Sequence, residues 1–310
     1  MDRAHAVLEA ELAHPGHDVH RLGDEFTFDE VRDCLRSLNN HKAAGSNGIP
    51  AELFKYSGCT GVQALTHLFN AVITTRCVPS VWRPGVMVHL PKGGDTGDCP
   101  NYRPLTLLPV VDKLFAKLLS ERIARAVCLH DQQFAFRPGR GTLSPLQNLL
   151  AVVQQRTHAN KATYACFLLP QQHMNKVPHA LLLHRLLQRG VVGPVFAILM
   201  AMCSSASSAV RVVTALSPAF VVQRGVAQGC PLSPLLCAIF IDPVLQDMQC
   251  LSHPDMLSVG PAASQRTLMG QAYADDLPGK AATQQGLQRV AQAVHIHSLR
   301  WGWLLNVRRW

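Results

Sequence analysis

Hydrophobic residues recur at helical spacing over much of the chain. Val31, Leu35 and Leu38 form one apolar face, and Thr27 followed by Glu30 is the sequence of a capping box. We therefore predict a helix that begins after Thr27. Further helices are predicted at Val62–Thr75, Val110–Val127, Leu143–Arg156, Pro178–Gln188, Pro194–Met202, Pro231–Met248 and Ala281–Arg300.

Shorter apolar stretches predict strands, since Gly85–Leu90 alternates between its two faces and Thr163–Leu169 is an apolar run of the length of a buried strand. The predicted strands are Gly85–Leu90, Thr163–Leu169, Ala209–Ala215 and Ala219–Arg224, with the last two joined by Leu216-Ser217-Pro218. Helices and strands alternate without a strict βαβ order. This arrangement predicts an α/β or α+β fold.

Composition agrees with a folded protein, because 48% of the 310 residues are hydrophobic and only 16% are charged. The formal net charge of +9 favours a polyanionic partner such as nucleic acid. The charge is unevenly placed, since no Asp or Glu occurs between Asp131 and Asp242. On the helix Val110–Val127, a row of Lys and Arg allows either a solvated face or a nucleic-acid contact.

The ten cysteines contain no C-x-x-C pair, and this spacing argues against a zinc site and against a disulfide framework. Reduced thiols suit an intracellular protein, nuclear or cytoplasmic. The N-terminal residues carry acids and histidines and do not resemble a secretory signal. The apolar run Leu235–Ile241 is too short to span a bilayer, so we expect no membrane partner.

Two adjacent carboxylates, Asp275 and Asp276, follow a short Tyr/Ala run in the sequence QAYADDL. Side chains of adjacent residues on a strand point to opposite faces. At the tip of a hairpin, one carboxylate could face a cleft and bind Mg²⁺ while the other supports it. Taken alone, the pair is also compatible with an ordinary surface turn.

Three loops carry residues suited to binding phosphate or bases. Lys92 and Arg103 flank a polar loop and could grip a triphosphate, or could be simple solvated charges. Gln228 and Gly229 place a polar side chain beside bare backbone, just before Pro231. The segment Gln133–Thr142 interleaves aromatics with Arg and Gly, a composition that suits backbone contact and base stacking.

Several of these segments, taken in order, resemble the reverse transcriptase domain of non-LTR (LINE-type) retrotransposons. The resemblance rests on Asn101–Leu108 (NYRPLTLL), Gln133–Thr142, Arg224–Ile241 (RGVAQGCPLSPLLCAIFI) and Ala272–Asp276 (AYADD). The loop Lys42–Glu52 is similar to the family's Lys-Ala-Pro-Gly-Pro-Asp-Gly-Ile, although the prolines and the Asp are replaced.

The resemblance implies a right-hand polymerase fold. Residues 1–24 would be an N-terminal tail, 25–160 the fingers with part of the palm, and 161–310 the palm. The implied activity is RNA-directed DNA synthesis by two-metal nucleotidyl transfer, with two Mg²⁺ ions as cofactors and an RNA template, a DNA primer and a dNTP as partners. Asp275 and Asp276 would be catalytic metal ligands. Lys92, Arg103, Gln228 and Gly229 would bind the nucleotide.

The same comparison shows departures from the family pattern. Aligned on Lys176-Val177-Pro178, the family's other metal-binding Asp falls at Leu169, and the aromatic that excludes a 2′-hydroxyl falls at Met174. Leu cannot ligate Mg²⁺, which requires oxygen. Pro278 lies where the return strand of the hairpin should run, and we expect it to disturb that strand. The chain stops after Gly302–Arg309, so we also expect it to lack the thumb.

These departures predict a degenerate, truncated copy of a retroelement polymerase with impaired catalysis. Two alternatives stay open. One is a nucleic-acid-binding or interaction module that kept the fold without the chemistry. The other is an active reverse transcriptase with an unusual metal site.

Overall fold

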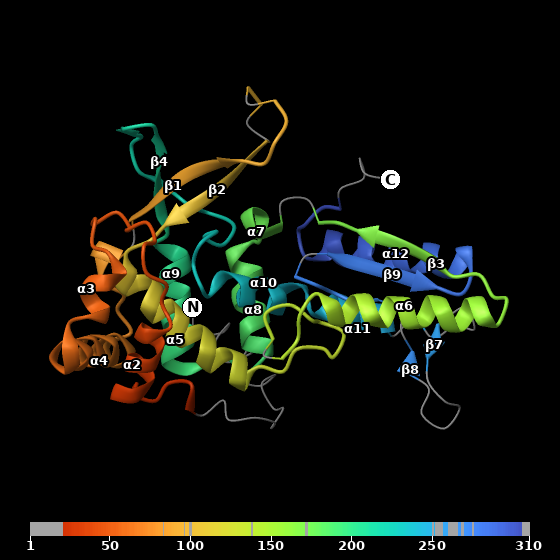
Figure 1. Cartoon of the computed structure of the whole chain (residues 1–310), viewed down its shortest axis with the longest axis horizontal. Coiled ribbons are helices and arrows are strands. Elements are labelled where there is room, and N and C mark those ends of the chain that lie inside the picture. Colours follow the sequence, from red (N-terminus) through yellow and green to blue (C-terminus); the bar gives the residue numbers. More distant parts are fainter. Residues whose placement is uncertain are drawn as a thin grey trace, which may run out of the picture. The chain divides into compact units, whose positions relative to one another are not determined.

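The structure is a computed structural model that describes residues 21–82, 84–95, 97–98, 101–137, 139–170, 173–249, 251, 257–259, 266–267, 270–274 and 276–305. Most of the predicted N-terminal tail, Asp275 and the end of the segment Gly302–Arg309 therefore lie outside the described residues. The chain forms two compact units (Figure 1). One comprises Met1–Cys128 and Pro178–Ser233, and the other comprises Leu129–Val177 and Pro234–Trp310.

The first unit contains a mixed sheet with the strand order β2-β1-β4-β5, and β6 also pairs with β4. Strand β1 runs antiparallel to β2, from Val86 opposite Leu107 to Pro91 opposite Tyr102, and parallel to β4. The strands are β1 (Pro84–Pro91), β2 (Tyr102–Leu107), β4 (Ser207–Val212), β5 (Ala215–Leu216) and β6 (Phe220–Val221).

Two details of this sheet correct the sequence prediction. The polar loop was expected to run to Pro104, but the first three residues of β2 lie in this stretch, and Pro104 is tolerated there because β2 lies at the edge of the sheet. The chain reverses at Val213-Thr214, not at Leu216-Ser217-Pro218, because Val212 pairs with Ala215. Ser217 instead stays beside β4, where its hydroxyl oxygen accepts a hydrogen bond of 2.9 Å from the Val210 backbone.

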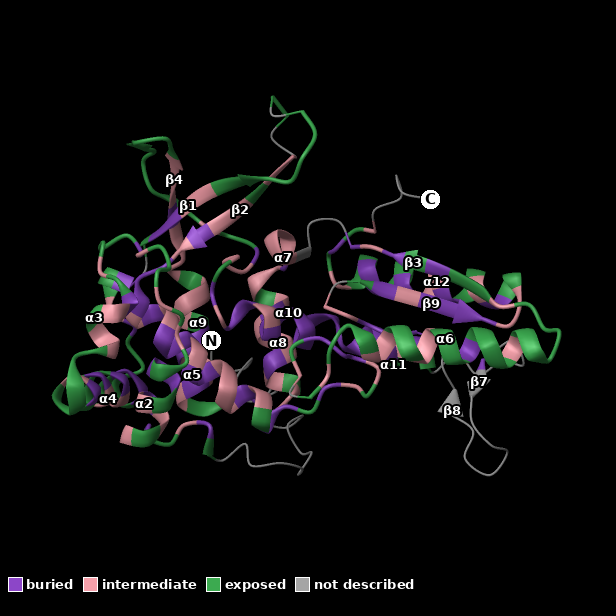
Figure 2. Cartoon of the chain, in the orientation of Figure 1, coloured by how far each residue is buried: buried purple, intermediate pink, exposed green. Residues whose placement is uncertain are grey.

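The helices of the first unit enclose an aromatic core, which is buried in Figure 2. Phe26, Phe69, Trp82 and Phe115 contact one another with ring centroids 5.4–6.4 Å apart. The elements are α2 (Phe28–Arg36), α3 (Ala51–Lys55), α4 (Gly58–Thr75), the 3₁₀ turn η2 (Ser80–Trp82), α5 (Val110–Ala126), α8 (His179–Gln188) and α9 (Gly193–Ser204). The predicted capping box at Thr27 and Glu30 is present.

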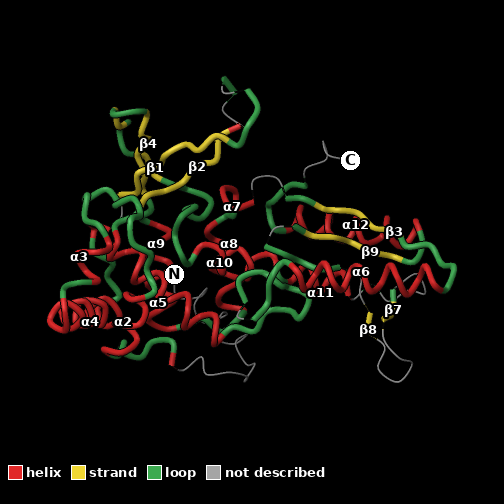
Figure 3. Tube along the Cα trace, in the orientation of Figure 1, coloured by secondary structure: helices red, strands yellow, loops and turns green. Residues whose placement is uncertain are grey.

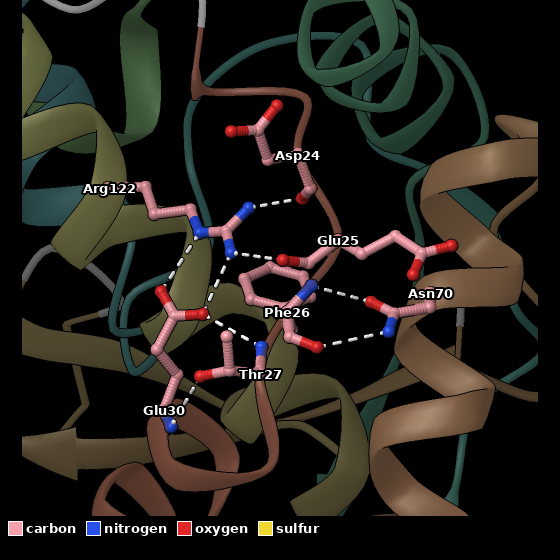
Figure 4. A network of polar contacts seen from close by, with 7 residues as sticks. All are labelled: Asp24, Glu25, Phe26, Thr27, Glu30, Asn70 and Arg122. Carbon is pink, nitrogen blue, oxygen red and sulfur yellow. Dashed lines mark hydrogen bonds and ion pairs between the residues drawn. The ribbon is translucent and has the colours of Figure 1, made fainter.

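Arg122 joins this core to the start of α2 (Figure 4). Its guanidinium lies 4.0 Å from the Phe26 ring centroid, forms a 2.9 Å ion pair with Glu30, and donates to the carbonyl oxygens of Asp24 and Glu25. Burial opposes ionisation of Glu30, but hydrogen bonds from Arg122 and Thr27 hold its pKa below the ordinary value. Arg122 is therefore a structural residue and not part of a free basic face.

The second unit is built on an antiparallel pair, β3 (Tyr164–Leu168) with β9 (Leu277–Ala281). Helix α12 (Gln284–Arg300) packs on both strands (Figures 1 and 3). A Cβ at Gly279 would lie 2.9 Å from the Val290 side chain, so β9 and α12 approach closely. The other elements are α6 (Leu143–His158), α7 (His173–Lys176), α10 (Ser233–Ile241), α11 (Pro243–Gln249), β7 (Ser258–Val259) and β8 (Arg266–Thr267).

The single helix predicted to end at Met248 is divided in two at Asp242. Asp242 is fully buried, and its carboxylate accepts a 2.7 Å hydrogen bond from the His130 backbone. Pro243 follows, and a proline has no backbone N–H with which to continue the helical ladder. Helix α12 also begins later than predicted, at Gln284, because Ala281 belongs to β9.

Candidate nucleotide-binding loop and carboxylate hairpin

Tyr273 and Asp276, on either side of the turn, pair as in a hairpin, which is one of the two arrangements that the sequence left open. Tyr273 and Asp276 exchange both backbone hydrogen bonds, at 3.0 and 3.1 Å, and close a tight turn. Ala274 lies in this turn with a φ of 58°, and Asp276 is exposed beside the start of β9. Asp275 lies outside the described residues. The hairpin therefore presents the Asp276 carboxylate at the end of the β3–β9 pair.

Leu169 lies directly after β3, at the same end of that pair. Leu168 is opposite Leu277, so one further step of the register places Leu169 opposite Asp276. Residues opposite one another in an antiparallel pair share a face of the sheet. Where the resemblance implies an Asp facing the hairpin, this chain has an alkyl side chain.

The described donor atoms at this position do not match a two-metal site. Mg²⁺ binds oxygen ligands, and Leu169 contributes none. Within the described parts of the chain, no group of three or more His, Cys, Asp or Glu side chains is placed to hold a metal ion. The carboxylate of Asp276 is thus not joined by one from β3.

The expectation that Pro278 would disturb the return strand is wrong. Strand β9 runs through Pro278, which lies opposite Phe167 of β3. The Pro278 carbonyl accepts a 3.2 Å hydrogen bond from the Gln271 N–H, on the side away from β3. The N and C=O of a strand residue point to the same side, so the missing N–H affects only the hairpin side. The β3 ladder is unaffected.

Lys92 and Arg103 lie together at one end of the β1–β2 pair in the first unit. Arg103 is opposite Leu90, and the Lys92 N–H donates a 2.8 Å hydrogen bond to the Asn101 carbonyl. Because side chains alternate along a strand, Lys92 and Arg103 share one face of the hairpin. Both are exposed, so the two cations can approach the same anionic group.

Gln228 and Gly229 lie against the same strand. The Thr106 N–H donates a 2.6 Å hydrogen bond to the Gln228 carbonyl. Gly229 has a φ of 113°, and a Cβ there would come within 2.7 Å of the Thr106 carbonyl and 3.1 Å of the Leu105 side chain. Leu105 shares a strand face with Arg103. The structure therefore places Lys92 and Arg103 on one face of β1–β2, and places Gln228 and Gly229 against the backbone of β2 beside Leu105 and Thr106.

A buried carboxylate beside this loop was missed by the sequence reasoning. Asp112, in the first turn of α5, is only 5% exposed, and burial raises its pKa to about 7. Burial is the main cause that raises the pKa of the Cys230 thiol to about 11, and the nearby Asp112 carboxylate adds to this rise. An acid in the first turn is typical of any helix, so the sequence held no signal of this burial.

The segment Gln133–Thr142 does not present its aromatics and arginines as expected. Phe134 is buried, and Arg140 lies over its ring at 5.5 Å and pairs with Asp131. The Arg137 guanidinium donates to backbone carbonyls at His130 and Gln133. Phe136, half exposed with a φ of 57°, is the aromatic of this segment that remains available for stacking.

Lys280 is a second buried charge that the sequence did not indicate. It is fully buried in β9, burial lowers its pKa to about 8, and its ammonium donates to the Gln271 side-chain oxygen. A lysine in a short strand is ordinarily assigned to the solvent face, so only the packing shows that it is enclosed.

Comparison with solved structures identifies the fold. The chain resembles apo telomerase from Candida tropicalis truncated from its C-terminal domain, with a TM-score of 0.51. The match covers 79% of this chain and 54% of that chain, at 12% identity. It supports the predicted fold class, a mixed helix and strand fold of the reverse transcriptase polymerases.

Residues 90–308 match the family model described as reverse transcriptase (RNA-dependent DNA polymerase). The chain belongs to this family, and its relatives place it with the non-LTR, LINE-type elements. It is 26% identical to a probable RNA-directed DNA polymerase from transposon BS of Drosophila melanogaster, over 80% of this chain and 27% of that protein. It is 27% identical to a polyprotein of the type-1 retrotransposable element R2 of Popillia japonica, over 64% of this chain and 28% of that protein.

The RNA-directed DNA polymerase from mobile element jockey of Drosophila funebris is also similar, at 25% identity over 88% of this chain. The match covers 29% of that polymerase, so the chain spans under a third of the length of these relatives. Among the described helices, none is both long and apolar enough to cross a bilayer.

Proposed function

We propose that the chain is a retroelement reverse transcriptase domain that retains nucleotide and nucleic-acid binding but catalyses nucleotidyl transfer poorly. The observation that carries this proposal is the register of β3 with β9, which ends at Leu168 opposite Leu277, so that one further step of the same register would place Leu169 opposite Asp276. Family members use metal-binding carboxylates from both strands. A single carboxylate hairpin cannot supply the second side of that site.

The nucleotide-binding part of the proposal rests on the face of β1–β2 that carries Lys92 and Arg103, and on the loop with Gln228 and Gly229 that lies against β2. Arg103 offers a bidentate fork to phosphate oxygens, and Lys92 offers a compact positive charge. Gln228 and Gly229 would line the nucleotide site from the loop that is bonded to Thr106. Their role is to hold and orient the triphosphate of a dNTP.

We assign residues 25–160 to the fingers with part of the palm and 161–310 to the palm. The template would be RNA and the primer DNA, as in the relatives named RNA-directed DNA polymerases. Mg²⁺ is the cofactor that the family uses. When bound, it stabilises negative charge on the transferring phosphate.

Primer extension on an RNA template tests the catalytic part. With Mg²⁺ or Mn²⁺, we expect the chain to extend a DNA primer about 100-fold or more slowly than the double variant Leu169→Asp with Met174→Phe. Phe167→Asp is the matched control. It adds a carboxylate to the same strand face at an exposed position two residues away, and should not raise the rate.

Robust metal-dependent extension by the unaltered chain would contradict impaired catalysis and favour an active enzyme with an unusual metal site. If the double variant gains no activity, the loss lies elsewhere than at Leu169.

The second candidate is a nucleic-acid-binding module without catalysis. It is favoured by the net charge of +9 and by the absence of acids from 132 to 241. This candidate predicts RNA binding that weakens steeply with salt and no extension by either the natural chain or the double variant. The two assays together separate the candidates.

A further inference from the structure

His179, the first residue of α8, bonds to the N-terminal end of the loop that carries Gln228 and Gly229. Its ring atom Nε2 lies 2.7 Å from the Gly225 carbonyl oxygen. A carbonyl oxygen only accepts, so Nε2 carries the hydrogen and donates it. The preceding residue, Pro178, forms an antiparallel bridge with Arg224. The start of α8 is therefore tied to the start of the loop.

The end of the loop is tied to β2. The Thr106 N–H donates to the Gln228 carbonyl at 2.6 Å, and the Cys230 N–H donates to the Ala227 carbonyl at 3.1 Å. Gly225 and Cys230 are buried, whereas Gln228 is half-buried and Gly229 is exposed. The loop is thus held at both ends, and from Gly225 to Cys230 its exposed residue is Gly229, next to the bonded Gln228.

The backbone of the loop needs such fixation. Gly225 has a φ of 82° and Gly229 a φ of 113°. Glycine reaches these values without strain but also populates many others, so it does not hold a loop by itself. Among the described residues, the side-chain hydrogen bond that reaches Gly225 is the one from His179.

We propose that His179 is a positioning residue that sets the Gln228-Gly229 loop for nucleotide binding. The inference rests on the proposed function in one respect, that this loop lines the nucleotide pocket. His179 itself acts through the Gly225 carbonyl and does not contact the nucleotide. Removing its donor frees the first end of the loop while the Thr106 bond retains the second.

Amide hydrogen exchange on the full chain tests the positioning itself. Replacing His179 by Phe keeps a ring without the donor, and replacing it by Ala removes both. We expect either change to speed exchange of the Cys230 amide, whose N–H donates to the Ala227 carbonyl inside the loop, about fivefold, the effect of losing one neutral hydrogen bond. Gln places an amide nitrogen near the position of Nε2, so His179→Gln should retain most of the protection.

The control is His67→Ala, at an exposed position on α4 of the same unit. It should leave the loop unchanged. A purely structural role for His179 would instead speed exchange throughout α8 and α9, lower the melting temperature, and show no rescue by Gln. That result overturns the proposal, as does unchanged loop exchange in His179→Phe. If the Ala variant does not fold, the Phe and Gln variants still decide.

A second readout separates this inference from the proposed function. Titration of a dNTP onto the chain with an RNA template and DNA primer should show about fivefold weaker binding for His179→Phe than for His179→Gln, with unchanged affinity for the template–primer. If the unaltered chain binds no dNTP, the proposed function fails at the nucleotide site, while the exchange data still report whether His179 holds the loop. Normal dNTP binding by the Phe variant overturns the positioning role in recognition.

Discussion

Replacing Asp112 by Asn should stabilise the protein at neutral and alkaline pH. Asp112 is 5% exposed in the first turn of α5, with Lys113 and the Cys230 thiol as its ionisable neighbours. Burial raises its pKa from 3.8 to about 7. A carboxylate that must ionise in such a place favours the unfolded state, where water solvates it.

The sign follows from proton linkage. The folded state holds the proton more tightly, so the stability that Asp112 contributes is fully present below about pH 4 and is lost as the pH rises to about 7. The difference between the two pKa values corresponds to roughly 4 kcal/mol above pH 7. Asn cannot ionise, but burying its polar amide also costs free energy, so we expect a net gain of about 2 kcal/mol at pH 8.

Urea unfolding of the parent and of Asp112→Asn at pH 5 and pH 8 measures the effect. The stabilisation by Asn should be larger at pH 8 than at pH 5. Asp98→Asn, in an exposed loop of the same unit, should show no such pH dependence. If Asp112→Asn changes stability equally at both pH values, Asp112 titrates normally and the burial argument is wrong.

Three further substitutions test the packing. Arg122→Lys should lower stability by about 2–3 kcal/mol, because Lys cannot bond Glu30 and the backbone together, whereas Arg125→Lys on the exposed face of α5 should have little effect in urea unfolding. Val213 has a φ of 55°, in the left-handed region that is unfavourable for a β-branched residue and better tolerated by Asn. Val213→Asn should therefore raise the free energy of unfolding by about 1 kcal/mol, and an unchanged melting temperature would refute this backbone strain. Gly229→Ala should weaken dNTP binding at least tenfold, because its Cβ would lie 2.7 Å from the Thr106 carbonyl, and equal affinity would show that the loop moves freely.

Most helices were predictable from local patterns, because apolar spacing and capping sequences act within a few residues. The capping box at Thr27 and Glu30 is present, and helix α5 follows the predicted apolar face closely. Strand β2 was missed because Pro104 is unfavourable in an interior strand, and only the sheet order shows that β2 is an edge. The hairpin turn at Val213 was missed because its residues lack the usual turn chemistry.

The burial of charged residues was also not predictable from local sequence patterns. The helical pattern assigned Arg122 to a basic outer face, and nothing in the sequence indicated that Lys280 is buried. Arg122 instead lies over Phe26, and Lys280 is fully buried beside Gln271. Burial depends on segments far apart in the chain, which no local pattern reports.

The sequence by itself determined the family, the order of its motifs and the absence of an acid at Leu169, because these are properties of residue identity and spacing. Only the tertiary structure decided that β3 pairs with β9 up to Leu168 opposite Leu277, one step before Leu169 and Asp276. It also decided that Lys92 and Arg103 share one face of β1–β2 and that Gln228 and Gly229 lie against β2. Strand pairing and close backbone approach join residues many positions apart. These contacts therefore depend on the folded structure and cannot be predicted from the order of residues along the chain.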